Sequence, residues 1–224
     1  MTATLEQSSK LSISSASNKA ATAWVDRQLN PARAKAIEEH AGASFLDVGC
    51  GNGRYVLHYA NTHQTAGLDI QSYPQWEEAE FRFRTGDAAE LPYDDNSFDT
   101  ICCFETLEHV PDPNRVLQEL HRVARRNVIL SVPNCELPAA LKDSRLTYFH
   151  YTDRSHVNFF RKDTLAQAFR IAGFVDCTVT PINPCPMRPL IEDLFRIPRI
   201  ASKLLARFSA QDQFRMTLLA VATV

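Results

Sequence analysis

The sequence predicts an α/β fold in which a mainly parallel β-sheet is covered by helices on both faces. Short apolar runs alternate with helical patterns along most of the chain, the order of elements that builds parallel sheets. A glycine-rich turn joins the first of these runs to the helical pattern that follows it. The chain has 224 residues, 45% of them apolar, so it can bury the core of one large domain.

Seven apolar runs are expected to be strands because of their length and the turn residues between them. The third run alternates Phe and Arg, which is typical of a strand near the edge of a sheet. In chain order the seven runs are Ser44–Val48, Thr65–Ile70, Phe81–Thr85, Phe98–Phe104, Asn127–Val132, Phe174–Val179 and Phe214–Val221.

Helical patterns occupy several of the gaps between these runs. Gly42 and Gly173 follow the first and the last pattern, at positions where glycine commonly ends a helix. Connections between parallel strands are expected to be right-handed crossovers. The patterns cover Ala20–His40, Arg54–Ala60, Asn114–Arg126 and Leu165–Ala172.

The predicted organisation is a disordered tail at 1–19 followed by a single domain at 20–224. Two stretches interrupt the alternation and are interpreted as insertions, at about 134–158 and 181–213. No apolar run approaches the ~20 residues that cross a bilayer, and the N-terminus lacks the apolar core of a secretory signal. We expect a cytoplasmic protein whose six cysteines are small buried residues in a reducing compartment.

The charge balance argues against nucleic-acid binding. The formal net charge is -2 and the isoelectric point is about 6.4, whereas general nucleic-acid binders carry a basic excess. We therefore expect no nucleic-acid partner.

The strongest local signal is the turn Asp47-Val48-Gly49-Cys50-Gly51-Asn52-Gly53, where a predicted strand meets a predicted helix. Alternating glycines permit positive φ and a close approach of a ligand to the backbone, and the helix N-terminus supplies free N–H groups. Position 54 is Arg, so the dinucleotide fingerprint G-x-G-x-x-G is not met. Asp47 would repel a pyrophosphate, but it suits the amino group of S-adenosylmethionine (SAM), which is favoured over NAD.

Two further acids follow predicted strands. Asp69 lies 20 residues after Gly49, where a carboxylate can accept hydrogen bonds from both ribose hydroxyls. Asp87 could accept from an adenine amino group while the Ala88 amide reaches a ring nitrogen. The alternatives are a solvated acid at the strand end for Asp69 and an Asx-type turn for Asp87.

Together these segments resemble the class I SAM-dependent methyltransferases, and among them the type 11-like group. The likeness covers roughly residues 44–179, and it is most specific up to His109 because order, spacing and identity all match. It is carried by Leu46–Gly53, Leu68–Ile70, Gly86–Pro92, Asp95–Asp99, Glu108–Val110, His156–Phe160 and Ala172–Phe174.

The resemblance implies a Rossmann-like sheet of seven strands in the order 3-2-1-4-5-7-6, with the last strand antiparallel. It implies an enzyme with SAM as cofactor and S-adenosylhomocysteine (SAH) as product. The acceptor is expected to be a small molecule, methylated on O, N or C. The expected cofactor-binding residues are Asp47, Gly49, Cys50, Gly51, Gly53, Asp69, Ile70, Asp87, Ala88 and Phe104.

Three histidines are the candidates for catalysis. His109 follows the fourth predicted strand, close to where the methyl group would lie, and could act as an acid or base or orient the acceptor. The alternative is that its ring packs the following loop. His150 and His156 lie in the first insertion near Asp153, in either an acceptor pocket or a surface loop. Zinc bound by His150 and His156 is a remote alternative, and no metal site is predicted.

Three alternatives to this prediction stay open. The stretch Arg188–Phe208 mixes apolar and basic residues, so it could be a lid over a lipid-like acceptor. It could equally be helices that cover the sheet edge or form a homodimer face. The chain could also be a non-catalytic SAM-binding regulator or pseudoenzyme. An aminopropyltransferase is disfavoured, because no cluster of acids in the insertions suits a polyamine.

Overall fold

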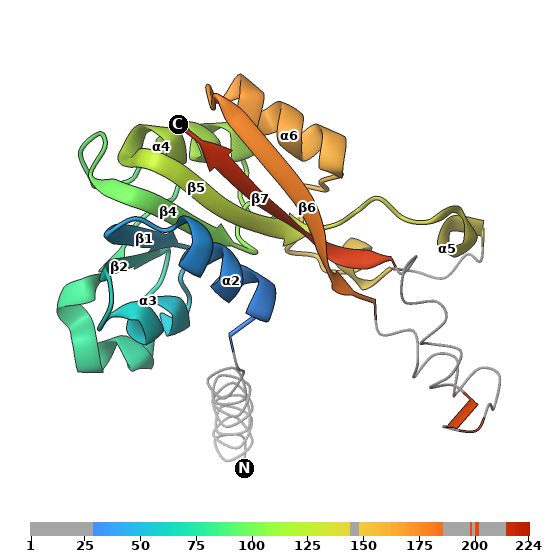
Figure 1. The fold of residues 1–224 in the computed structure, drawn as a ribbon, viewed down its shortest axis with the longest axis horizontal. Helices are drawn as coiled ribbons and strands as arrows, with labels where there is room; N and C mark the ends of the chain where they lie inside the picture. Colours follow the sequence, from blue (N-terminus) through green and yellow to red (C-terminus); the bar gives the residue numbers. More distant parts are fainter. Residues whose placement is uncertain (1–28, 144–147, 186–197, 199, 202–213) are drawn as a thin grey trace, which may run out of the picture.

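The structure is a computed structural model that describes residues 29–143, 148–185, 198, 200–201 and 214–224. Within these residues seven strands form one sheet in the order β3-β2-β1-β4-β5-β7-β6. β7 is antiparallel to both of its neighbours and the other pairs are parallel, so the predicted fold class is confirmed (Figure 1). The strands are β1 (Ser44–Val48), β2 (Gln64–Asp69), β3 (Phe83–Thr85), β4 (Phe98–Phe104), β5 (Ala124–Pro133), β6 (Asp176–Pro184) and β7 (Arg215–Thr223).

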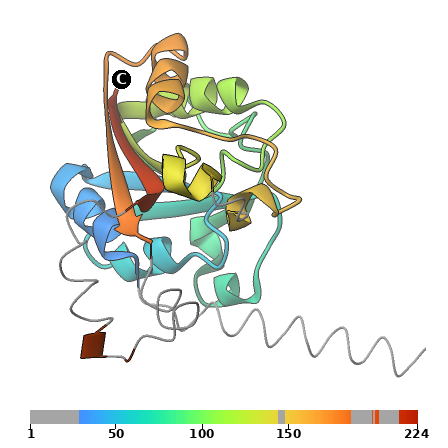
Figure 2. The ribbon, with the colours of Figure 1, turned by 90° about the vertical axis from the view of Figure 1, so that its right-hand side faces the viewer.

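Helices cover both faces of this sheet. On one face α4 (Pro113–Val123) and α6 (Lys162–Ile171) contact each other and the sheet, and on the other lie α2 (Pro31–His40) and α3 (Arg54–Tyr59) (Figure 1 and Figure 2). A short helix α5 (Ala139–Asp143) and two 3-10 segments, η1 (Pro74–Arg82) and η2 (Phe149–Tyr151), complete the described elements. None of the described helices is long and apolar enough to cross a membrane.

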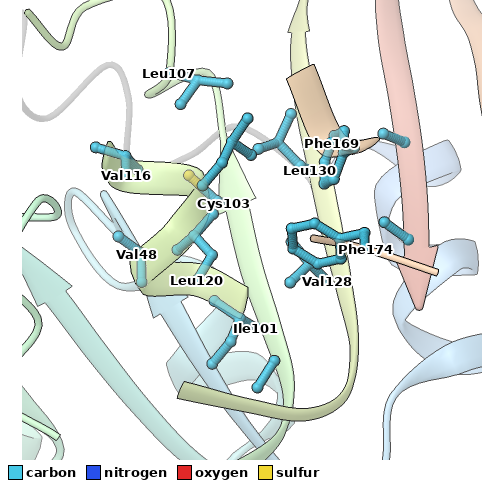
Figure 3. Close-up of a cluster of buried hydrophobic side chains, with 14 of the residues drawn as sticks. Val48, Ile101, Cys103, Leu107, Val116, Leu120, Val128, Leu130, Phe169 and Phe174 are labelled. Carbon is cyan, nitrogen blue, oxygen red and sulfur yellow. The ribbon is translucent and has the colours of Figure 1, made fainter. Parts of the chain in front are cut away.

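The strands place alternate side chains in two apolar clusters, one on each face of the sheet. Phe45 and Cys102 pack with α2 and α3, whereas their chain neighbours Leu46 and Cys103 pack with α4 and α6. Figure 3 shows the second cluster, which also holds Phe169 of α6. All six cysteines are free. Four of them are buried as predicted, whereas Cys177 and Cys185 are only half-buried.

The two glycines expected to cap helices behave differently. Gly173 adopts φ +104° after α6, and its N–H donates to the Arg170 carbonyl (3.2 Å) while the Phe174 N–H donates to the Phe169 carbonyl (3.2 Å). This is the Schellman arrangement. The prediction for Gly42 is wrong, because an extended residue ends α2. Gly42 is needed for space instead: a Cβ there would lie 2.4 Å from the Cβ of Asp99.

Several boundaries differ from the predicted ones. β3 begins at Phe83 rather than Phe81, because η1 continues to Arg82 and leaves the Phe81 side chain 84% exposed. β3 is nevertheless an edge strand, as its alternation predicts. α4 ends at Val123, so β5 begins three residues earlier than Asn127.

The second predicted insertion begins later than Pro181, because β6 continues to Pro184 and pairs with β7 over this length. Proline cannot donate a hydrogen bond, but β6 lies at the edge of the sheet, where one side of the backbone needs no partner. The tail predicted at 1–19 lies outside the described residues, as does Arg188–Phe208 apart from 198, 200 and 201.

Candidate active site

The glycine-rich turn joins the carboxyl end of β1 to α3. Gly49, Gly51 and Gly53 all have positive φ, at 72°, 53° and 78°. The N–H groups of Gly49 and Cys50 both donate to the carbonyl of Leu68 in β2 (2.8 and 3.1 Å), which holds the turn against the neighbouring strand. The turn is therefore held by backbone hydrogen bonds, and glycine lets it adopt these positive φ angles without strain.

The three glycines face different surroundings. A Cβ at Gly49 would collide with Thr106, and a Cβ at Gly53 would collide with the ring of Phe83. At Gly51 nothing lies within 4 Å of the same position. Gly51 thus presents open space to a ligand, whereas Gly49 and Gly53 are small because protein atoms approach them.

Asp69 and Trp76 hold Gly51 from two sides. The Gly51 N–H donates to Oδ2 of Asp69 at the end of β2 (2.8 Å), and Trp76 Nε1–H donates to the Gly51 carbonyl (2.9 Å). The Trp76 ring stacks on Phe83, with centroids 4.9 Å apart. Trp76 was not predicted from the sequence, since it belongs to no glycine or acid pattern.

Asp47 lies beneath the turn and is only 2% exposed. Burial raises the pKa of this carboxyl to about 8, and Asp69 adds to the effect, while Arg33 and Arg54 oppose it. A buried acid of this kind gains from a cation placed next to it. The role of Asp47 toward an amino group stays a prediction.

A cleft of about 1180 Å³ extends from the glycine turn to the histidines of the first insertion. Its lining includes Asp47, Gly49, Cys50 and Gly51 of the glycine turn, and Glu108, His109, His150, Asp153 and His156. Phe104 also lines the cleft, and the guanidinium carbon of Arg33 lies over its ring, 5.4 Å from the centroid. The candidate cofactor turn and the candidate catalytic residues therefore share one cavity.

Asn158 attaches the first insertion to the turn after β4. Its side-chain amide donates to the carbonyls of Leu107 (3.0 Å) and Val110 (2.7 Å), and its backbone N–H donates to the carbonyl of Glu108 (3.1 Å). The Val157 N–H donates to the same Glu108 carbonyl (2.9 Å). These contacts bring two segments together that are about 50 residues apart in the sequence.

The attachment places the three predicted histidines side by side. The rings of His109 and His156 meet edge-on at 4.8 Å, and His150 stacks on His156 at 5.3 Å. His109 Nδ1 lies 3.1 Å from the carbonyl of Ser155, and His156 Nδ1 lies 3.1 Å from the carbonyl of His150. Burial lowers the pKa of His150 to about 4, so its ring is neutral at pH 7.

Two acids and one arginine in the cleft were not predicted from the sequence. Arg33 of α2 pairs with Glu105 (2.5 Å), which also accepts from Ser131 Oγ (3.0 Å). Glu108 is buried, and burial together with Glu105 raises the pKa of its carboxyl to about 8. Glu105 and Glu108 could have been found from their positions in the sequence, because both lie near His109 directly after the fourth strand.

A family model described as a methyltransferase domain matches residues 20–179. This chain belongs to that methyltransferase family. With its fold and its relatives, it is a class I SAM-dependent methyltransferase of the type 11-like group, and SAM is its cofactor.

Curated relatives match parts of this methyltransferase. The 27-O-demethylrifamycin SV methyltransferase of Amycolatopsis mediterranei is 39% identical over 98 residues, or 38% of this chain and 36% of that protein. A ubiquinone biosynthesis O-methyltransferase of Azotobacter vinelandii is 36% identical over 126 residues, or 46% of this chain and 53% of that protein. The methyltransferase thus spans about half the length of such relatives or less.

Solved structures share the fold. A SAM-dependent methyltransferase from Archaeoglobus fulgidus gives a TM-score of 0.61 at 19% identity, covering 86% of this chain and 93% of that one. The [4+2]-cyclase SpnF gives 0.55 at 21% identity, covering 85% of this chain and 78% of that one. Likeness at this level shows the fold alone, because one fold supports different reactions.

Five of the predicted cofactor residues of this methyltransferase are not among those that line the cleft, namely Gly53, Asp69, Ile70, Asp87 and Ala88. Ile70 is 73% exposed beyond the end of β2. Asp87 forms the Asx-type turn that was its alternative, accepting from the Ala89 N–H at 2.8 Å. Ala88 packs against the apolar core. Their roles toward SAM stay predictions.

Proposed function

We propose that this methyltransferase transfers the methyl group of SAM to a small molecule bound between the glycine turn and the histidines. The observation that carries this proposal is that one cleft is lined both by the buried acid and open glycine of the turn and by three histidines. Drug-sized ligand pockets measure about 300 to 1,000 Å³. A cleft of about 1180 Å³ gives room for the cofactor and a second molecule.

The residues of the turn fit the cofactor. Gly51 leaves room for a ligand at its Cα, Asp47 offers a buried carboxyl that an amino cation would ionise, and Asp69 orients Gly51. When bound, SAM supplies an activated methyl group: the acceptor lone pair forms the new bond and the S–C electron pair returns to sulfur. The chain then has to align the acceptor and exclude water, which supplies about 7 to 11 kcal/mol in ideal cases.

The histidines fit the acceptor. Because a carbonyl only accepts, Nδ1 of His109 carries the proton in its contact with Ser155, and Nε2 keeps its lone pair. That lone pair can accept a hydrogen bond from an acceptor hydroxyl and orient its oxygen, or take up the proton released on methyl transfer. Several relatives are O-methyltransferases by name, so hydroxyl compounds are the first acceptors to test.

The proposal is tested in two steps. SAH at about 100 times its Kd should add about 2.7 kcal/mol to the free energy of unfolding, and NAD should add none. SAH formation from SAM is then measured with a panel of hydroxyl and amine acceptors. His109→Gln should lower kcat about 10²- to 10⁴-fold without weakening SAH binding, and His58→Gln, an exposed histidine on α3, serves as control.

Each outcome has a distinct meaning. Turnover that depends on His109 supports the proposal. Stabilisation by SAH without turnover of any acceptor would favour the non-catalytic regulator. If neither SAH nor SAM stabilises the protein, the cofactor role of the turn is wrong.

A further inference from the structure

Glu108, His109 and His156 form a close cluster in the lining of the cleft. Each offers one ligand atom, and these three atoms all lie within 4.8 Å of one another. Two of the residues come from the turn after β4 and the third from the loop that follows η2. All three line the same cleft as the glycine turn.

Both imidazoles are already oriented for a ligand. The Nδ1 atoms lie 3.1 Å from the backbone carbonyls of Ser155 and His150. Because a carbonyl oxygen only accepts hydrogen bonds, both Nδ1 atoms carry a proton and donate it. Nε2 of each ring is therefore the atom with the free lone pair. A carbonyl that fixes the distal nitrogen of a histidine in this way is the usual outer partner of a metal-binding imidazole.

The carboxylate of Glu108 supplies an independent observation. Its side chain is 1% exposed, and Oε2 is buried without a hydrogen-bond partner among the described residues. The nearby Arg33 favours the ionised form of Glu108, but its guanidinium pairs with Glu105 and does not outweigh the burial. His109 Nε2 is 3.8 Å from Oε1, too far for a hydrogen bond. A buried acceptor without a partner is costly and points to a missing positive group.

We propose that Glu108, His109 and His156 bind one divalent transition-metal ion. Two imidazole nitrogens and one carboxylate oxygen suit Zn²⁺, Mn²⁺, Fe²⁺ or Co²⁺, whereas Mg²⁺ and Ca²⁺ prefer sites made of oxygen atoms. Ligand atoms at about 2.1 Å from one ion lie at most about 4.2 Å apart. Small side-chain rotations therefore convert the observed cluster into a coordination site.

The metal site would also restrict the class of acceptor that the enzyme methylates. This part of the inference rests on the proposed function. Three protein ligands leave coordination positions open toward the cleft, as in catalytic rather than structural sites. An acceptor oxygen fits such a position, and the ion, which uses the Nε2 lone pair of His109, would then take the place of that lone pair in orienting the oxygen. The site would therefore favour acceptors with a hydroxyl, or with two neighbouring oxygens, over amines and carbon nucleophiles.

Metal binding can be measured without turnover. The full chain is freed of metals with a chelator and titrated with CoCl2, while visible d–d absorption reports coordination by nitrogen and oxygen. We expect one Co²⁺ per chain, displaced by Zn²⁺. Glu108→Gln and His156→Gln should each weaken Co²⁺ binding at least about 100-fold, whereas His58→Gln should leave it unchanged.

Stabilisation by SAH is recorded on the same samples, so that failure of the metal site is separate from failure of the proposed function. Loss of Co²⁺ binding in both variants, with their stabilisation by SAH intact, supports the site. Absence of Co²⁺ and Zn²⁺ binding in a wild-type chain that SAH stabilises overturns the metal site alone. Tight Co²⁺ binding that persists in Glu108→Gln overturns it too, because the ion then lies elsewhere.

Discussion

Asp47 shows at the scale of one residue how burial prepares a site for a cation. Its carboxyl lies beneath the glycine turn with a pKa of about 8, raised by burial and by Asp69. Arg33 and Arg54 act in the opposite direction, but they do not offset the burial. The free protein therefore holds a proton on Asp47 at neutral pH. A bound amino cation would favour the ionised carboxylate and expel that proton.

We expect SAM binding to release a proton from Asp47 below pH 8. Affinity should rise with pH toward about 8, by at most tenfold per pH unit, because binding has to displace the proton. It should level off there, where an α-amino group itself loses charge at about 7.7 to 8.0. Calorimetry in buffers of different ionisation enthalpy measures the released proton.

Asp47→Asn is the matched variant for this experiment, since it keeps the shape and cannot ionise. Its SAM affinity should be lower at pH 8 and nearly independent of pH below that value. A pH dependence in Asp47→Asn equal to that of the wild type would assign the proton to another group.

At the scale of an element, the turn from β1 to α3 uses glycine for two different reasons. The Thr106 side chain packs directly against Gly49, and its Oγ1 would lie 2.0 Å from a Cβ at this position. At Gly51 no protein atom lies within 4 Å of the Cβ position, which faces open space. Both have positive φ, so the backbone strain of a side chain is similar at the two positions.

Alanine should therefore separate folding from binding along this turn. Gly51→Ala should lower the free energy of unfolding by about 1 to 2 kcal/mol from strain and reduce SAH affinity by at least about tenfold, because the methyl group enters ligand space. Gly49→Ala should destabilise the fold further, since strain and the collision with Thr106 add. Urea unfolding and SAH calorimetry of both variants check this. Unchanged SAH affinity in Gly51→Ala would place the ligand elsewhere.

At the scale of the whole molecule, one sheet separates two large apolar clusters, one on each of its faces. Cys102 and Cys103 are neighbours on β4, yet one packs with α2 and α3 and the other with α4 and α6. Both are fully buried, and burial raises the pKa of both thiols. Cys177 and Cys185 are half-buried on or near the edge strand β6.

Thiol labelling should therefore distinguish global from local opening. We expect Cys102 and Cys103 to react only through global unfolding, so SAH at 100 times its Kd should slow both about 100-fold. Cys177 and Cys185 should react faster, at rates that SAH does not change. Peptide mapping after timed labelling gives each rate. Labelling of Cys103 that SAH does not slow would show local opening of the central strands.

The sequence alone determined the features that local patterns encode. The alternation of apolar runs predicted the α/β sheet, because burial on both faces requires continuous apolar strands. The glycines, Asp47 and Asp69 were recognisable because their spacing reflects local turn geometry. The family resemblance added the strand order, which the structure confirms.

Only the tertiary structure decided which distant residues meet. His109 and His156 were predicted separately, and the Asn158 contacts make them neighbours. Arg33 and Glu105 are 72 residues apart, and only the packing of α2 over the end of β4 pairs them. Position 42 requires glycine because Asp99 packs against it, not because a helix ends there. Such contacts depend on the path of the whole chain, which cannot be read from the local periodicity of the sequence.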